Sequence, residues 1–266
     1  MKPQELQQVI TRYVEEFAER RLQRLEKLRL RQILRRKNPY LYKAIGSQKA
    51  NEIVENILRA YLSSSDEGIF GNMFFEPIAK AVSGGHVSPS EGVDIAIETD
   101  DKYLAISVKS GPNPYNSSQK KKQNQDFQAL RSRVLKLKKP FDALLGHCYG
   151  RTSGEPSKTQ IYRVRSGQRF WQELTGDPDF YQKLIRMMNE EIITKHKLEY
   201  ETRWQHAVNR YVREFTNDFC DERGAIDWEA IVRFNSGFDN GGRRVRKSNK
   251  GDIRNSRGRR SRSSRA

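Results

Sequence analysis

Cysteine is scarce in this sequence, and long apolar runs are absent. The chain has 266 residues and only two cysteines, Cys148 and Cys220, which lie far apart. Two thiols exclude a disulfide framework, and without a CxxC pair the cysteine pattern gives no indication of zinc. No run of about 18 apolar residues occurs, and the opening residues MKPQELQQVI contain no apolar signal region. We therefore expect a cytoplasmic protein that does not act in a membrane.

Negative charge is also in short supply. The chain has 33 acidic residues against 50 Lys and Arg, which gives a net charge of +17. Such a balance predicts a polyanionic partner, and nucleic acid is favoured over a membrane because no lipidation motif or amphipathic anchor is evident. Residues 241–266 contribute +10 through eleven Lys and Arg and one acid, so the rest of the chain still carries +7.

The last segment, 238–266, is rich in Gly, Ser and Arg and has almost nothing to bury. We expect this basic tail to be disordered. We also expect it to add sequence-independent affinity for nucleic acid that weakens as salt rises.

Helical periodicity dominates both ends of the chain. Apolar residues at three- and four-residue steps over residues 4–37 predict one long helix or two joined helices. The arginines on the other face are either solvated or in contact with a DNA backbone, and the pattern alone does not decide between these roles. Pro39 then interrupts the periodicity. The further expectations are a helix over 50–62, a polar junction with glycines over 63–71, a helix over 72–82 with a kink near Pro77, helical structure over 177–221, and a short helix over 227–234 capped by Asp227.

The middle of the chain changes to the short apolar runs of a sheet. Four β-rich segments, bounded by Gly, Pro, Asn or Asp, cover residues 93–98, 103–110, 141–150 and 160–166. A helical segment over 116–139 separates the second from the third. This order predicts an α/β fold with a mixed sheet packed by helices. The domain organisation expected is a helical region 1–63, a core 64–170, a second helical region 171–237 and the tail 238–266.

The first two predicted strands carry an acid and a lysine. Asp94 lies on the first strand, and the backbone carbonyl of Val108 and the side chain of Lys109 lie on the second. Hydrolysis of a phosphodiester uses a divalent cation, and Mg²⁺ prefers carboxylate and carbonyl oxygens. Lys109 would then stand beside the attacking water and the scissile phosphate. On spacing alone, a strand-end acid and a surface lysine are the more frequent explanation.

A second carboxylate is expected from outside this strand pair. The position two residues before Lys109 holds Ser107, which shares its face of the strand but cannot neutralise a cation. Glu76, in GNMFFEPIAK, lies on the helix before the sheet and is the predicted second acid; the alternative is that it is simply a solvated helix residue. The other acids are less well placed: Glu91, Glu98, Asp100 and Asp101.

The segment after Lys109 suits phosphate binding. It reads SGPNPYNSSQKKKQNQ, with a Gly/Pro turn, small hydroxyls at a helix start and three lysines. Helix N-termini and lysines both favour phosphate oxygens. The candidates for DNA-backbone contact are Asn113, Asn116, Ser117, Ser118, Gln119 and Lys120. Four other conspicuous side chains are expected to be packed interior groups: His147, Cys148, Phe170 and Trp171.

These motifs resemble a known superfamily. GVD, twelve residues and then SVK are similar to the PD-(D/E)XK nucleases, with the leading proline absent and the middle acid replaced by Ser107. KNPYLYKA, LSSSDEGIFGNMFFE, KSGPNPYNSSQ and GHCYGR followed by GQRFWQELTGDPDFY look like a family of type II restriction endonucleases, over residues 36–188. The resemblance implies Mg²⁺-dependent cleavage of double-stranded DNA at a short sequence, a homodimer and a partner DNA methyltransferase. It assigns the site to Asp94, Lys109 and Glu76.

Two other functions remain open on sequence grounds. One is a repair or transposition nuclease that selects DNA structure rather than sequence. The other is a DNA-binding protein without catalysis, in which Ser107 marks a site that has stopped working.

Overall fold

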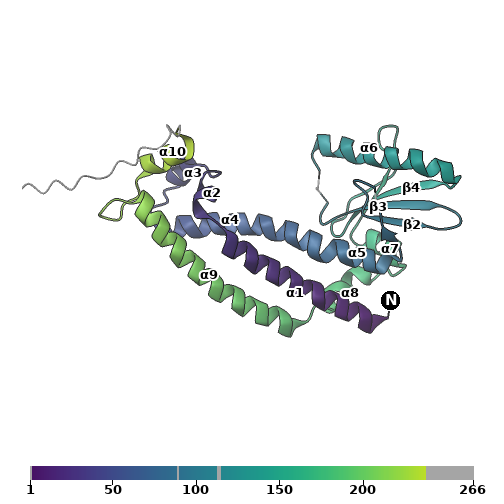
Figure 1. Ribbon diagram of the computed structural model, residues 1–266, viewed down its shortest axis with the longest axis horizontal. Coiled ribbons are helices and arrows are strands. Elements are labelled where there is room, and N and C mark those ends of the chain that lie inside the picture. Colours follow the sequence, from purple (N-terminus) through teal and green to yellow (C-terminus); the bar gives the residue numbers. More distant parts are fainter. Residues whose placement is uncertain (1, 89, 113–114, 238–266) are drawn as a thin grey trace, which may run out of the picture.

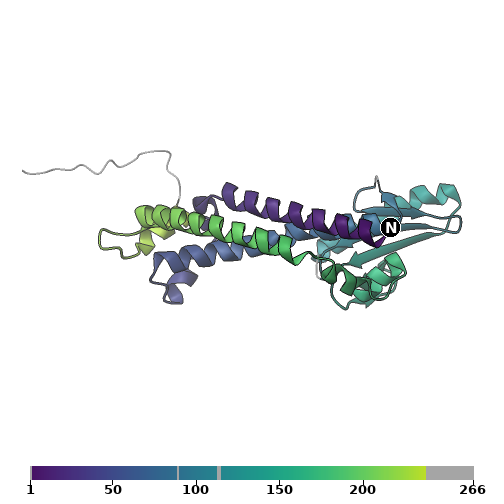
Figure 2. The same ribbon diagram turned by 90° about the horizontal axis from the view of Figure 1, so that it is seen from below.

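The molecule is elongated, with an α/β domain at one end and a helical arm at the other (Figures 1 and 2). The computed structural model describes residues 2–88, 90–112 and 115–237, so the predicted disordered tail lies outside the described residues. Within that part of the chain, none of the helices combines the length and the apolarity needed to cross a membrane.

Three long helices form the arm: α1 (Pro3–Lys27), α4 (Ala50–Phe70) and α9 (Glu190–Phe219). They lie side by side in both views, so segments from the two ends of the chain pack together (Figures 1 and 2). Three short helices gather at the far end of the arm: α2 (Leu30–Leu34), α3 (Pro39–Ala44) and α10 (Trp228–Ser236). Two joined helices over the first segment, and Asp227 as a helix cap, are thus confirmed.

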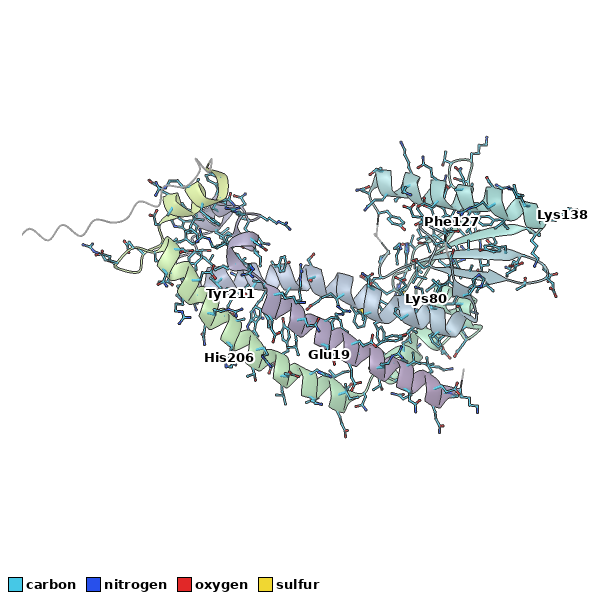
Figure 3. All side chains as sticks on the ribbon, viewed as in Figure 1. Glu19, Lys80, Phe127, Lys138, His206 and Tyr211 are labelled. Atoms are coloured by element: carbon cyan, nitrogen blue, oxygen red, sulfur yellow. The ribbon has the colours of Figure 1, made fainter. Side chains whose placement is uncertain are left out.

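Two separate apolar cores stabilise the arm. At its base, Leu6, Ile10 and Val14 of α1 pack into the core that lies under the sheet. At its far end, Leu25 packs with residues of α4, α9 and α10, including Phe215. There the hydroxyl of Tyr211 (Figure 3) donates a 2.6 Å hydrogen bond from α9 to the carbonyl of Leu28. The helical regions from both ends of the sequence therefore share one core.

A six-stranded mixed sheet forms the α/β domain, as the sequence predicts. Its order is β1-β2-β3-β4-β6-β5. The first three strands pair antiparallel, β3, β4 and β6 pair parallel, and β5 is antiparallel to β6. The strands are β1 (His86–Val87), β2 (Ile95–Glu98), β3 (Tyr103–Lys109), β4 (Phe141–His147), β5 (Ser153–Gly154) and β6 (Arg163–Ser166).

Helices cover both faces of this sheet (Figure 1). On one face lies α6 (Ser117–Val134), followed by the short 3₁₀ turn η2 (Leu135–Leu137), and Phe127 (Figure 3) is fully buried between α6 and the strands. The opposite face packs against α5 (Glu76–Ser83), α7 (Gln168–Thr175) and α8 (Phe180–Arg186). Because side chains alternate along β3, Ser107 and Lys109 belong to the face that α6 covers.

The predicted polar junction over residues 63–71 is wrong. Instead α4 continues to Phe70 and leads through the π-helix η1 (Gly71–Phe75) directly into α5. Leu62 and Phe74 are buried and extend the apolar stripe along the segment, while the serines lie on the other faces, so burial outweighs the low helix propensity of Ser and Gly. The π-turn ends two residues before Pro77, near which a kink was expected, and Pro77 lies in the first turn of α5.

Several short helices and strands were not predicted from the sequence. Pro39 was expected only to interrupt a helix, yet it occupies the first turn of α3, where its missing N–H costs nothing. Asn38 caps that helix by accepting a 3.2 Å hydrogen bond from the backbone N–H of Leu41. Strands β1 and β5 have two residues each, and α7 has eight, so none of them is long enough to show a clear period.

Candidate active site

Asp94 and Lys109 meet where β2 begins and β3 ends. Asp94 lies one residue before β2 and is held there because its backbone N–H donates a 2.8 Å hydrogen bond to the carbonyl of Ile106. Its Oδ2 accepts a 2.7 Å hydrogen bond from the backbone N–H of Val108 and lies 3.5 Å from Nζ of Lys109. The two side chains are 21% and 30% exposed, so this pair is half-sheltered but open to a ligand.

Ser107 supports this pair from the interior. Its side chain is fully buried, and its Oγ lies 3.4 Å from Oδ2 of Asp94 and 3.2 Å from Oε1 of Gln123. The neutral hydroxyl has one proton, which it donates to one of these two acceptors at a time. Ser107 therefore does not replace the charge of a second acid.

Glu76 begins helix α5, which packs on the face of the sheet opposite α6. It is the first residue of α5, and the preceding π-helix η1 packs against the end of β3 so closely that a Cβ on Gly71 would lie 3.0 Å from Cβ of Ser110. Its Oε1 lies 2.7 Å from Nζ of Lys80, and its side chain is 27% exposed. A π-turn inside a helix is a frequent feature of functional sites. The ionic contact of Glu76 is thus with Lys80, four residues along α5, while the segment just before it packs against the end of β3.

The pKa of the Cys148 thiol is affected by the charges of Glu76, Asp94 and Lys109. Burial raises its pKa well above the ordinary value, Glu76 and Asp94 raise this pKa further, and Lys109 lowers it. Cys148 follows β4 directly, and its backbone N–H donates a 2.9 Å hydrogen bond to the carbonyl of Lys109. Cys148 is therefore linked to the end of β3 through the backbone of Lys109.

The interior roles predicted for the other conspicuous side chains are confirmed. His147 is 3% exposed, and its Nδ1 lies 2.9 Å from Oγ of Ser166. Burial, with the charge of Lys109, lowers the pKa of His147 to about 4, so the ring is neutral at pH 7. Trp171 and Phe170 are buried, and Nε1 of Trp171 donates a 2.8 Å hydrogen bond to the carbonyl of Cys148.

The residues predicted to contact the DNA backbone lie at the start of α6. Asn116 caps the helix: its Oδ1 accepts 2.9 and 2.7 Å hydrogen bonds from the backbone N–H of Gln119 and from Oγ of Ser118. In return, Oε1 of Gln119 accepts a 2.9 Å hydrogen bond from the backbone N–H of Asn116, which completes a capping box. Ser117 and Lys120 are exposed, and Asn113 lies outside the described residues.

Two residues of the site were missed in the sequence. Gln123, on α6, is 4% exposed, and its Oε1 accepts a 2.6 Å hydrogen bond from the hydroxyl of Tyr115. Burial raises the pKa of Tyr115 to about 12, the hydrogen bond with Ser107 opposes this shift, and the charge of Asp94 adds to it. A signal existed: Gln123 precedes Phe127 by four residues and so stands in the apolar stripe of α6, where a polar side chain is unusual.

The oxygen donors at this edge fit a hard cation. Asp94 makes its contacts with Val108, Ser107 and Lys109 through Oδ2, so Oδ1 remains for a metal. N–H and C=O of one strand residue point to the same side, so the carbonyl of Val108 faces the side on which Asp94 lies. Across residues 2–88, 90–112 and 115–237, no three Asp, Glu, His or Cys side chains are grouped as a complete metal site. Carbonyl and water oxygens would therefore complete the coordination of Mg²⁺.

A protein-family model matches most of the chain. The family model described as "Type II restriction endonuclease EcoO109I" matches residues 4–196. This range begins in α1, includes the whole sheet with Asp94 and Lys109, and ends in the first turns of α9. No curated protein matches the chain.

Proposed function

Since the chain belongs to the EcoO109I family of type II restriction endonucleases, we propose that it cuts both strands of DNA at a short specific sequence by Mg²⁺-dependent hydrolysis. The observation that carries the proposal is the contact of Asp94 with both Lys109 and the backbone of Val108, at the open end of β3. The net charge of +17 supports a DNA substrate.

Three groups of the chain would hold the cation: the carboxylates of Asp94 and Glu76 and the carbonyl of Val108. Bound Mg²⁺ neutralises charge on the scissile phosphate and lowers the pKa of a bound water. Lys109, fixed beside Asp94, donates to the attacking water or to a phosphate oxygen and stabilises the negative charge that develops there. The exposed start of α6, with Lys120, binds a neighbouring phosphate of the backbone.

Two copies of the chain would supply one site for each strand of the DNA. A twofold-symmetric homodimer places two identical sites about an axis, and that symmetry matches a palindromic DNA sequence. Such an activity also endangers the DNA of its own cell, so we propose a DNA methyltransferase as functional partner, which modifies the same sequence.

The test is digestion of unmethylated plasmid and phage DNA with Mg²⁺ and with EDTA. We expect discrete Mg²⁺-dependent fragments. Lys109→Ala should reduce kcat by at least about 100-fold, with DNA affinity retained in EDTA. Glu76→Ala should raise the Mg²⁺ concentration needed for half-maximal cleavage, and Asp101→Ala, which removes an exposed acid of the turn between β2 and β3, serves as the control.

Each other outcome selects a different function. Cleavage that survives Glu76→Ala unchanged would remove Glu76 from the metal site. Cleavage at branched or damaged DNA without discrete bands would indicate a structure-selective repair nuclease. Binding without any cleavage would favour the non-catalytic DNA-binding protein, because the buried Ser107 adds no charge to the site.

A further inference from the structure

Helix α6 is clamped onto the loop that carries Asp94. Gly92, with φ of +73°, comes so close to α6 that a Cβ at this position would lie 2.5 Å from Oδ2 of Asp126. Nζ of Lys122 lies 2.9 Å from Oε1 of Glu91 and 2.6 Å from Oδ1 of Asp126. The loop before Asp94 is therefore shaped by its contact with this helix.

Gln123 makes the buried part of that contact. Its Nε2 donates a 2.7 Å hydrogen bond to the carbonyl of Gly92, and its Oε1 accepts from the hydroxyls of Tyr115 at 2.6 Å and Ser107 at 3.2 Å. A carboxamide donates and accepts through one planar group, whereas a carboxylate only accepts and an apolar side chain does neither. A buried polar group without partners is costly, so these three bonds explain a glutamine in an apolar stripe.

The three partners belong to the three segments that build the site. Gly92 is two residues before Asp94, and Ser107 is two residues before Lys109 on β3. Tyr115 directly precedes Asn116, the cap of the helix start that faces DNA in the proposed function. One side chain thus joins the proposed metal ligand, the strand with the lysine and the proposed phosphate-binding helix.

We propose that Gln123 is a positioning residue: it fixes the carboxylate of Asp94 relative to β3 and couples it to the DNA-facing start of α6. This inference rests on the proposed function, because it assigns the network to the geometry of that metal site. Gln123 itself is 4% exposed and its hydrogen bonds are to groups of the chain, so we assign it a positioning role rather than a contact with DNA. Its loss should therefore impair metal binding and turnover while leaving DNA affinity intact.

The test compares Gln123→Ala with Gln128→Ala, which truncates an exposed glutamine of the same helix. For the Gln123→Ala protein we expect kcat to fall by roughly 10- to 100-fold, and the affinity for Mn²⁺, measured by calorimetry without DNA, to fall by a similar factor. The Kd for the specific DNA in EDTA should stay at the wild-type value. Unchanged kcat and Mn²⁺ affinity in Gln123→Ala would overturn the proposal.

A second variant covers the case in which Gln123→Ala does not fold. Tyr115→Phe removes one hydroxyl from the network and leaves the packing of the ring, so a smaller loss of kcat and of Mn²⁺ affinity is expected. If Tyr115→Phe keeps the wild-type kcat and Mn²⁺ affinity, this result would contradict the positioning role proposed for Gln123.

Hydrogen exchange separates this proposal from the proposed function. The backbone amides around Gly92 and Asp94 should exchange faster in Gln123→Ala, whether or not the protein cleaves DNA. If wild-type protein cuts no DNA, the proposed function fails, while exchange and Mn²⁺ affinity still decide the role of Gln123. If wild-type protein cuts DNA and Gln123→Ala matches it in every measurement, only the positioning role fails.

Discussion

Arg163 on β6 binds Asp142 on β4 with two nitrogens, Nε at 2.9 Å from Oδ1 and Nη2 at 2.8 Å from Oδ2. Burial disfavours the charge of Arg163, but pairing with Glu173 and Asp142 outweighs this effect and raises the pKa of the guanidinium. The pair joins two parallel strands on the side of the sheet away from Asp94. Its contribution is therefore to the stability of the domain rather than to the site.

Removing this guanidinium should destabilise the domain. In Arg163→Ala, two carboxylates that are only 26% and 28% exposed lose their shared partner. We expect the free energy of unfolding to fall by about 2 kcal/mol in urea titrations. Arg131→Ala, an exposed arginine of α6, should change it by less than about 0.5 kcal/mol. Equal free energies of unfolding for the two variants would show that the ion pairs of Arg163 add nothing to the stability of the domain.

Two glycines near the π-turn should respond in opposite ways to alanine. Gly68 lies in α4 with open space around it, so Gly68→Ala should stabilise the protein by about 0.5–1 kcal/mol through helix propensity. A Cβ on Gly71 would crowd Ser110 at 3.0 Å, so Gly71→Ala should shift η1 and with it Glu76. For Gly71→Ala, but not for Gly68→Ala, we expect a lower kcat and a higher Mg²⁺ concentration for half-maximal cleavage. Thermal unfolding and cleavage assays on both variants check this.

The buried histidine predicts how stability depends on pH. The pKa of His147 is about 4 in the folded protein, below the ordinary value of 6.5, so the unfolded chain binds the proton more readily between these values. This contribution to stability is fully present above pH 6.5 and is lost as the pH falls toward 4, by up to about 1.4 kcal/mol per pH unit. Urea unfolding at pH 7 and pH 5 measures the loss. In His147→Gln, the free energy of unfolding should differ less between pH 7 and pH 5 than in the wild type. His206→Gln, on the exposed face of α9, should keep the wild-type difference.

The basic tail should act through charge alone. Deleting residues 238–266 removes eleven Lys and Arg and two Asp, a net charge of +9. We expect weaker binding to random-sequence DNA and a shallower fall of affinity with salt concentration, because fewer counterions are released. The cut position and kcat on the specific site should be unchanged. A changed recognition sequence after the deletion would contradict this view.

The contact between Asp94 and Lys109 was predictable because it depends on local sequence. Asp94 and Lys109 end up together because the acidic turn between them closes an antiparallel strand pair, and alternation along β3 then fixes which side chains share a face. The position of Glu76 depends on how η1 meets β3, which no periodicity reveals. Gln123 was missed because α6 is rich in lysine and glutamine, so its single buried polar position does not stand out before the loop under it is known.

The wrong prediction of a polar junction over residues 63–71 also arose because local sequence does not show which side chains become buried. Three serines, an aspartate and two glycines read as a break when judged by local propensity. In the folded protein, Leu62 and Phe74 bury their side chains on either side of this segment, and burial of two large apolar groups outweighs the summed propensity penalty.

The shared core at the far end of the arm affects how the enzyme emerges from the ribosome. Leu25 and Phe215 pack in the same core but are 190 residues apart in the sequence. At roughly 5–20 residues per second, the apolar face of α1 waits on the order of 10–40 s for its partner helix to be synthesised. The sheet that carries Asp94 and Lys109 is complete well before that moment. A nascent chain therefore holds a finished nuclease sheet while its arm still exposes apolar side chains, and chaperones that bind such surfaces have the longest access to this end of the molecule.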